Sequence, residues 1–218
     1  MSASSTDKGL LTPANCAVVF ADHQSQMLFG VGSMDRQALL NNTLLLAKTA
    51  KIFSVPVILT AVESRAFSGA LAPQLLHLFP EQEPIERTSL NSWDCEAFVH
   101  AVKKTGRRNF LIAALWTEAC LTFPALQMLE EGYGIYVVED ASGGASVGAH
   151  EAAIRRMEQA GAVSVTSLQV LLEFQRDWSR HEHYDEVMAL VKEHGGAYGQ
   201  GLDRAWPAEE SGGARAAR

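Results

Sequence analysis

Short apolar runs alternate with segments of helical periodicity along most of the chain, and this alternation constrains the fold more than any other feature. The runs at residues 16–22, 56–62, 109–115, 135–140 and 162–167 are rich in apolar and β-branched residues. Such runs predict strands that are buried on both faces. Strands that alternate with helices predict a mostly parallel sheet covered on both sides. We find no internal repeat and no domain boundary.

The segments between these runs carry apolar residues at helical spacing. Helices are predicted at residues 35–53, 92–106, 124–132, 149–161, 168–178 and 184–195. A hydrophobic content of 47% in 218 residues supports the core of a single domain, which we predict over residues 1–206. The small and polar residues 207–218 are expected to form a disordered tail.

The charge balance limits the partners that the chain can bind. The net charge is −7 and the sequence pI is about 5.5, which argues against nucleic acid and anionic membranes because both attract basic surfaces. The N-terminal residues are polar, and no apolar run has the length of a membrane-spanning helix. Three irregularly spaced cysteines do not form a disulfide framework. We therefore expect a cytoplasmic protein with reduced thiols.

The three cysteines differ in their surroundings. Cys16 opens an apolar run and is explained as a small buried residue. Cys95 lies between Asp94 and Glu96, whose charges disfavour a thiolate. Cys120 follows a predicted strand and enters a predicted helix, whose N-terminal amides would lower the pKa of its thiol. Cys120 is therefore the candidate nucleophile, although a packing role alone would also explain it.

A thiol nucleophile needs a base and a positive charge beside it. Asp22 ends the first apolar run, and desolvation there would raise the pKa of its carboxyl toward the range of a general base. Arg87 can reach the same edge of the sheet, since functional groups of parallel sheets gather at the carboxyl ends of strands. Each residue has a simpler explanation: Asp22 as a cap of the next helix, and Arg87 as a surface charge paired with Glu86.

A serine nucleophile is an alternative. The sequence GASVG matches the Gly-x-Ser-x-Gly pattern of α/β-hydrolases, with Ser146 as nucleophile and a later aspartate and histidine as partners, for example Asp177 and His181. In those enzymes the serine follows a strand directly, whereas here the apolar run ends at residue 140. The pattern is short and lies in a loop of small residues, so the cysteine hypothesis is favoured.

Metal and cofactor motifs are absent from the sequence. The pair His181 and His183 lies in a polar segment between predicted helices, and residues 30–32 lack the third glycine of a dinucleotide-binding loop. We predict no metal and no cofactor.

Several separated segments together resemble one known family. They are AVVFADHQ, PVILT, RTSLNSWDCEAFVHAV, LIAALWTEACLTFPAL, EEGYGIYVVEDASGG and RRMEQAGAVSVTS, and they run from about residue 14 to about residue 180. In this order they resemble the isochorismatase-like cysteine hydrolase superfamily, and more closely its YcaC-like subgroup. The Thr-x-x-Cys turn after a strand, ending at Cys120, is the most specific of these features.

The resemblance implies a three-layer α/β/α sandwich around a six-stranded, mostly parallel sheet. It also implies a triad of Asp22, Arg87 and Cys120, in which Arg87 takes the place of the family's usual lysine. Arginine stays protonated, so proton transfer would fall to Asp22. A cis peptide at Leu115–Trp116 would turn the amide of Trp116 toward that of Cys120 and form an oxyanion hole.

The activity implied is cysteine-dependent hydrolysis of a C–N bond in a small amide, imide or carbamoyl compound, through a thioester. Phe29, Phe67, Trp93 and Trp116 would line the pocket for a small-molecule substrate, although each could equally be a packing residue. Residues 63–73 lack the aspartate and histidine ligands of the metal-dependent nicotinamidases. The resemblance further implies a homo-oligomer, either a tetramer or an octamer. A scaffold that senses oxidants or electrophiles through Cys120 is the alternative function.

One local feature is left open by the sequence. If the helix near Cys120 begins at Thr117, Pro124 interrupts its hydrogen bonding. If the helix begins near Pro124, Cys120 lies in the preceding turn and gains less from the helix dipole.

Overall fold

The structure is a computed structural model that describes residues 9–205. The chain divides into two compact units, one ending at Phe174 and the other beginning at Gln175, and each is described by itself. The single domain expected over residues 1–206 stays a prediction. The disorder expected at residues 207–218 lies outside the described residues.

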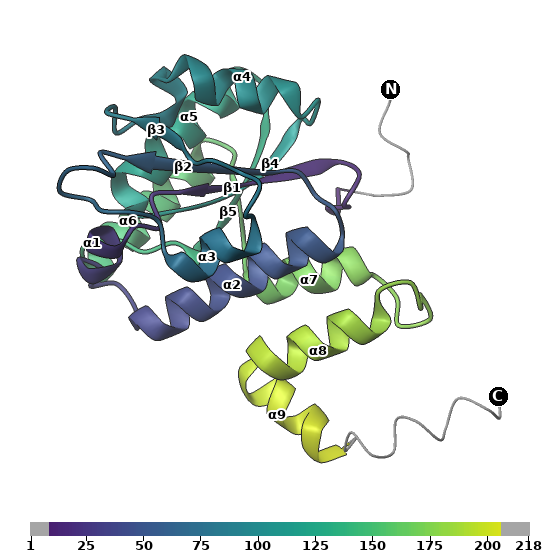
Figure 1. The fold of residues 1–218 in the computed structure, drawn as a ribbon. Coiled ribbons are helices and arrows are strands. Elements are labelled where there is room, and N and C mark those ends of the chain that lie inside the picture. The colour runs from purple at the N-terminus through teal and green to yellow at the C-terminus, as the bar shows by residue number, and fades with distance from the viewer. Residues whose placement is uncertain (1–8, 206–218) are drawn as a thin grey trace. The chain divides into compact units, whose positions relative to one another are not determined.

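The first unit is built on a parallel sheet of six strands in the order β3-β2-β1-β4-β5-β6 (Figure 1). The strands are β1 Cys16–Ala21, β2 Val57–Val62, β3 Ile85–Arg87, β4 Asn109–Ala114, β5 Gly134–Val138 and β6 Val163–Val165. The predicted α/β sandwich is confirmed. The apolar runs anticipate five strands and miss β3, because a strand of three residues with one buried side chain leaves no apolar run.

Helices cover both faces of the sheet. They are α1 Ser25–Phe29, α2 Arg36–Ile52, α3 Pro73–Leu78, α4 Glu96–Lys104, α5 Thr122–Glu130, α6 Val147–Gln159 and α7 Ser167–Gln175. The sequence does not predict α1 or α3, since five or six residues are too few for a helical period to stand out. The helix predicted over residues 92–106 is divided into a 3-10 turn, Ser92–Asp94, and α4.

Two hydrophobic clusters lie on opposite sides of the sheet. Along β1, Val18 and Phe20 belong to one cluster, and Ala17 and Val19 belong to the other, as the alternation of a strand requires. The first cluster includes residues of α2, α3 and α7, and the second includes residues of α4, α5 and α6 (Figure 1). β1 and its neighbour β4 therefore lie at the centre of the core, which explains their continuous apolar runs.

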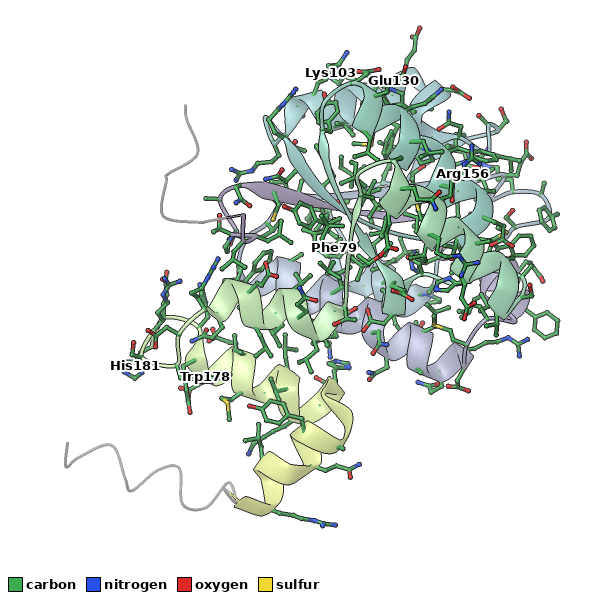
Figure 2. The ribbon with its side chains drawn as sticks, turned by 180° about the vertical axis from the view of Figure 1, so that it is seen from behind. Phe79, Lys103, Glu130, Arg156, Trp178 and His181 are labelled. Atoms are coloured by element: carbon green, nitrogen blue, oxygen red, sulfur yellow. The ribbon has the colours of Figure 1, made fainter. Side chains whose placement is uncertain are left out.

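The second unit contains α8 Tyr184–His194 and α9 Gly196–Ala205. Its first loop carries Trp178 and His181, which Figure 2 labels, and the ring of Trp178 packs edge-on against Tyr184. The sequence predicts α8 and misses the glycine-rich α9. Among the described residues, no helix combines the length and the apolar character needed to cross a membrane. The cytoplasmic location stays a prediction.

Candidate active site

Three residues that the sequence singles out come together at the carboxyl edge of the sheet. Asp22 follows β1, Arg87 ends β3, and Cys120 lies in the turn after β4. Asp22 has a φ angle of 60°, in the left-handed region where aspartate is tolerated better than most residues. Its amide donates to the Thr60 carbonyl oxygen at 3.0 Å. The backbone therefore turns sharply at Asp22 while remaining bonded to the neighbouring strand.

Asp22 and Arg87 form a buried ion pair. Nη2 of Arg87 donates to Oδ2 of Asp22, and Nη1 donates to the carbonyl oxygen of Ser89. Oδ1 of Asp22 has no hydrogen-bond partner of ordinary geometry in the described part of the chain. Burial raises the pKa of the Asp22 carboxyl above its usual range, and the charge of Arg87 opposes this rise. The arrangement leaves Oδ1 available to accept a proton.

Cys120 lies beside this ion pair and is almost fully buried, with 1% of its surface exposed. Its thiol interacts with the Asp22 carboxyl, and the backbone N–H of Trp116 donates to the sulfur. Burial, followed by the charge of Asp22, raises the pKa of the Cys120 thiol to about 12. The lowered thiol pKa that the sequence predicts is therefore wrong. The sulfur is protonated at rest because the site excludes water and holds a carboxylate next to it.

The turn that carries Cys120 is π-helical. It spans Thr117–Leu121 and leads directly into α5, so the helix begins later than Thr117 and Pro124 falls in its first turn. A proline is tolerated there because the first amides of a helix have no intrahelical acceptor. The Leu115–Trp116 peptide is cis, as the resemblance implies.

Thr117, the first residue of this turn, is fixed at three points. Its amide donates to the Gly143 carbonyl oxygen at 3.0 Å, and its own carbonyl oxygen accepts from the Thr122 hydroxyl at 2.7 Å. Its side-chain oxygen lies 2.8 Å from Nδ1 of His150, which is buried on α6. His150 is not predicted from the sequence, because a single histidine within an amphipathic helix resembles an ordinary surface position.

The predicted pocket residues differ in their positions. Phe29 and Phe67 are exposed, at 74% and 69%, in the segments that follow β1 and β2. Trp116 is half-buried, and its indole N–H donates to the Met27 carbonyl oxygen at 2.9 Å. Phe29 and Phe67 lie on connections that leave the carboxyl edge of the sheet, and Trp116 follows β4 at the same edge. Each of the three therefore stays a proposed contact for substrate.

Trp93 has the contacts of a packing residue. Its ring lies edge-on against Phe98 and Tyr133, and its indole N–H donates to Glu131 at 2.7 Å. Tyr133 immediately precedes β5, at the amino end of that strand. The side chain of Trp93 therefore packs toward the edge opposite Cys120, and we leave it out of the proposed pocket.

Ser146 does not have the geometry of a serine nucleophile. It comes well after the end of β5 at Val138, and its hydroxyl accepts a hydrogen bond from the Ala149 amide as the N-cap of α6. Its suggested partners, Asp177 and His181, belong to the second unit. A capping serine after a loop lacks the sharp strand-to-helix turn of the α/β-hydrolases.

In the part of the chain that the structure describes, the remaining candidates show no features of a second site. Within residues 9–205, no three histidine, cysteine or acidic side chains cluster as metal ligands. Cys16 is buried, and its thiol points to the Thr12 carbonyl oxygen at 3.1 Å. Cys95 is half-buried at the start of α4.

The fold and these residues define an isochorismatase-like hydrolase. The chain belongs to the isochorismatase family, since the model of the Isochorismatase domain matches residues 16–169. The match lies within the first unit and contains Asp22, Arg87 and Cys120.

Relatives of the YcaC type are similar to most of the chain. Probable hydrolase YcaC of Escherichia coli K12 is 41% identical over 165 residues, covering 75% of this chain and 79% of that protein. The structure of YcaC from Pseudomonas aeruginosa with hexane-2,5-diol and covalent acrylamide is 36% identical, with a TM-score of 0.86, and covers 94% of this chain and 99% of that one. The structure of Escherichia coli YcaC, an octameric hydrolase of unknown specificity, is 37% identical with a TM-score of 0.86, covering 91% and 96%.

Proposed function

We propose that the protein hydrolyses a C–N bond of a small amide, imide or carbamoyl compound, with Cys120 as the nucleophile. One observation carries the proposal: the Cys120 thiol interacts directly with a buried carboxyl, Asp22, which is itself paired with Arg87. A thiol, an adjacent base and a group that orients the base are the parts that nucleophilic catalysis requires.

In the proposed acylation step, Asp22 accepts the thiol proton as the sulfur attacks the substrate carbonyl carbon. Because the resting thiol has a raised pKa, proton transfer and attack occur together. The charge of Arg87 favours the ionised form of Asp22 before the attack, and a guanidinium does not shuttle a proton. The S–C bond forms, the C–N bond breaks, and Asp22 passes the proton to the departing nitrogen.

The negative charge on the carbonyl oxygen needs donors beside the sulfur. The amide of Trp116 already donates to the sulfur, so it lies next to the position that the oxygen takes once the S–C bond forms. We assign the oxyanion hole to the amides of Trp116 and Cys120. Loss of one such donor typically costs about 2.7–4 kcal/mol of transition-state stabilisation.

Water completes the proposed cycle. Asp22 removes a proton from a water molecule as its oxygen attacks the thioester carbon. The C–S bond then breaks, the acid leaves, and the proton returns from Asp22 to the sulfur. The same carboxyl thus acts as a base in both half-reactions.

Two properties of relatives support separate parts of the proposal, the reactive cysteine and the assembly. The Pseudomonas aeruginosa YcaC structure contains covalent acrylamide, which is both an electrophile and a small amide. Escherichia coli YcaC is octameric, and we extend a homo-oligomeric state to this chain.

The sensor alternative gains no support from the site, because oxidant-sensing cysteines are exposed and have a low pKa, whereas Cys120 is buried with a raised pKa.

The test is a panel of small amides, imides and carbamoyl compounds assayed for release of ammonia or amine. Wild-type protein and the Cys95→Ser control should turn over the same compounds, while Cys120→Ser and Asp22→Asn should turn over none. Full turnover by Cys120→Ser would exclude the cysteine mechanism. Loss of turnover in Ser146→Ala with Cys120→Ser still active would instead support the serine alternative.

A further inference from the structure

A buried histidine, His150, is hydrogen-bonded to the turn that carries Cys120. His150 projects from α6, and its Nδ1 is 2.8 Å from the Thr117 side-chain oxygen. Thr117 opens the turn in which Cys120 is the fourth residue. The histidine is thus linked to the turn by a single hydrogen bond. The groups that act on the Cys120 thiol are Asp22, Arg87 and the backbone of Trp116, and His150 is not among them.

The charges around His150 indicate which ring nitrogen carries the proton. Nε2 lies 3.9 Å from Oε1 of Glu139, and the carboxylates of Glu118 and Glu151 also act on the ring. Burial lowers the pKa of His150, so the ring is neutral at pH 7. We assign the proton to Nε2, where it faces Glu139, which leaves Nδ1 to accept the hydrogen bond of the Thr117 hydroxyl.

The same region is closely packed on its other side. A side chain added at Gly144 would meet Oε2 of Glu118 at 2.5 Å and Cβ of His150 at 3.2 Å. Oε1 of Glu118 accepts from the Ala145 amide at 2.9 Å. The loop that follows β5 therefore packs closely against both the cysteine turn and the start of α6.

We propose that His150 is a positioning residue, which acts through the Thr117 hydroxyl to keep the Cys120 turn closed. Thr117 follows directly after Trp116, whose amide donates to the sulfur, so a shift of Thr117 displaces that donor as well. The importance of this hydrogen bond for catalysis rests on the proposed function. The closed turn itself does not, because it is a property of the resting protein.

The proposal predicts the reactivity of Cys120 when the hydrogen bond is lost. Burial is the largest cause of the raised thiol pKa, so opening of the turn hydrates the sulfur and increases its thiolate fraction. Alkylation of Cys120 should therefore become faster, although the site is less well organised for turnover.

The experiment measures alkylation of the full chain by iodoacetamide at pH 8, with each cysteine quantified by peptide mass spectrometry. Asparagine places its amide oxygen where histidine has Nδ1, whereas glutamine places its amide group near the position of Nε2. His150→Asn and Thr117→Ser should therefore react within about twofold of wild type, and His150→Gln and Thr117→Val about tenfold faster. The double variant Thr117→Val/His150→Gln should match either single variant, because both remove the same hydrogen bond.

Cys16 is the internal control for global opening. It is fully buried in β1, with a thiol pKa that burial raises to about 12, and it lies in the hydrophobic cluster on the other side of the sheet. Cys16 should keep its wild-type rate in every variant. The exposed His100→Gln on α4 is the matched substitution and should change neither rate.

Three results would overturn the proposal. Equal rates for His150→Asn and His150→Gln would show that the Nδ1 position has no role. A parallel increase at Cys16 would show a general loss of stability, and multiplied effects in the double variant would show that the two residues act separately. The measurement needs no substrate, so an absence of amide turnover would count against the proposed function alone.

Discussion

The indole ring of Trp116 lies directly against the backbone of Gly30. A Cβ atom at residue 30 would lie 2.5 Å from Cζ2 of the ring, which is closer than such atoms approach in proteins. The ring cannot move aside easily because its N–H is bonded to Met27. The end of α1 and the residue beside the nucleophile are thereby fitted to each other.

We predict that Gly30→Ala lowers the free energy of unfolding by about 1–3 kcal/mol, the usual cost of adding a group to a filled space. Urea unfolding measures this loss. In a Trp116→Phe background, which lacks the clashing atom, the same substitution should cost much less. Gly148→Ala on α6, where nothing lies within 4 Å, is the control and should not destabilise. An equal loss in both backgrounds would contradict the proposed contact.

Asp22→Asn separates the acidity of Cys120 from its use in catalysis. The Asp22 carboxylate raises the pKa of the Cys120 thiol, whereas Arg87 lowers it. Removal of the carboxylate charge leaves Arg87 unopposed, so the thiol pKa should fall and alkylation at pH 8 should accelerate. Turnover should nevertheless be lost because no base remains. The check is the pH dependence of alkylation beside the ammonia assay, and slower alkylation in the variant would contradict it.

Arg87→Met leaves the Asp22 carboxylate buried and unpaired. Removal of one partner of a buried ion pair typically costs about 3–5 kcal/mol, and both side chains are almost completely buried here. Arg87→Lys keeps the charge but loses the second donor to the Ser89 carbonyl oxygen, so its cost should be smaller. Urea unfolding at pH 7 ranks the variants, and equal costs would show that the charge itself is unimportant.

We predict that the buried His23 makes the free energy of unfolding fall in acid. Burial lowers the pKa of His23 to about 4, from 6.5 in the unfolded chain, while Nε2 remains bonded to the Ala141 carbonyl oxygen. The unfolded state therefore binds more protons below pH 6.5, and stability falls as the pH decreases toward 4. A shift of this size corresponds to about 3 kcal/mol. In His23→Gln, which keeps a donor for Ala141, this part of the loss should be absent between pH 6.5 and 4.

The parts of the fold that the sequence predicts are those where burial alone determines residue type. β1 and β4 are covered on both faces, so every position except Asn109 at the start of β4 is apolar and the runs are visible. β3 and α3 are short, and β3 also lies at one edge of the sheet, so the local sequence pattern of either element carries little information.

The site is predicted more unevenly than the fold. Asp22 and Cys120 follow strands that are recognisable as apolar runs in the sequence. Because these strands are parallel, their carboxyl ends lie at the same edge of the sheet and bring the two side chains close together. The state of the thiol does not follow, because it depends on how completely the surrounding helices exclude water. His150 is found only in three dimensions, since its partner Thr117 is distant in sequence and nothing in the helix pattern distinguishes it.

The strand order has a consequence for how such a protein diversifies. β1 and β4 are neighbours at the centre, and from them the chain extends outward in opposite directions, through β2 and β3 on one side and β5 and β6 on the other. The carboxylate and its guanidinium partner therefore come from the first half of the chain, and the sulfur comes from the second. Insertions in either half can therefore change the surroundings of one set of reacting groups without altering the strands that carry the other.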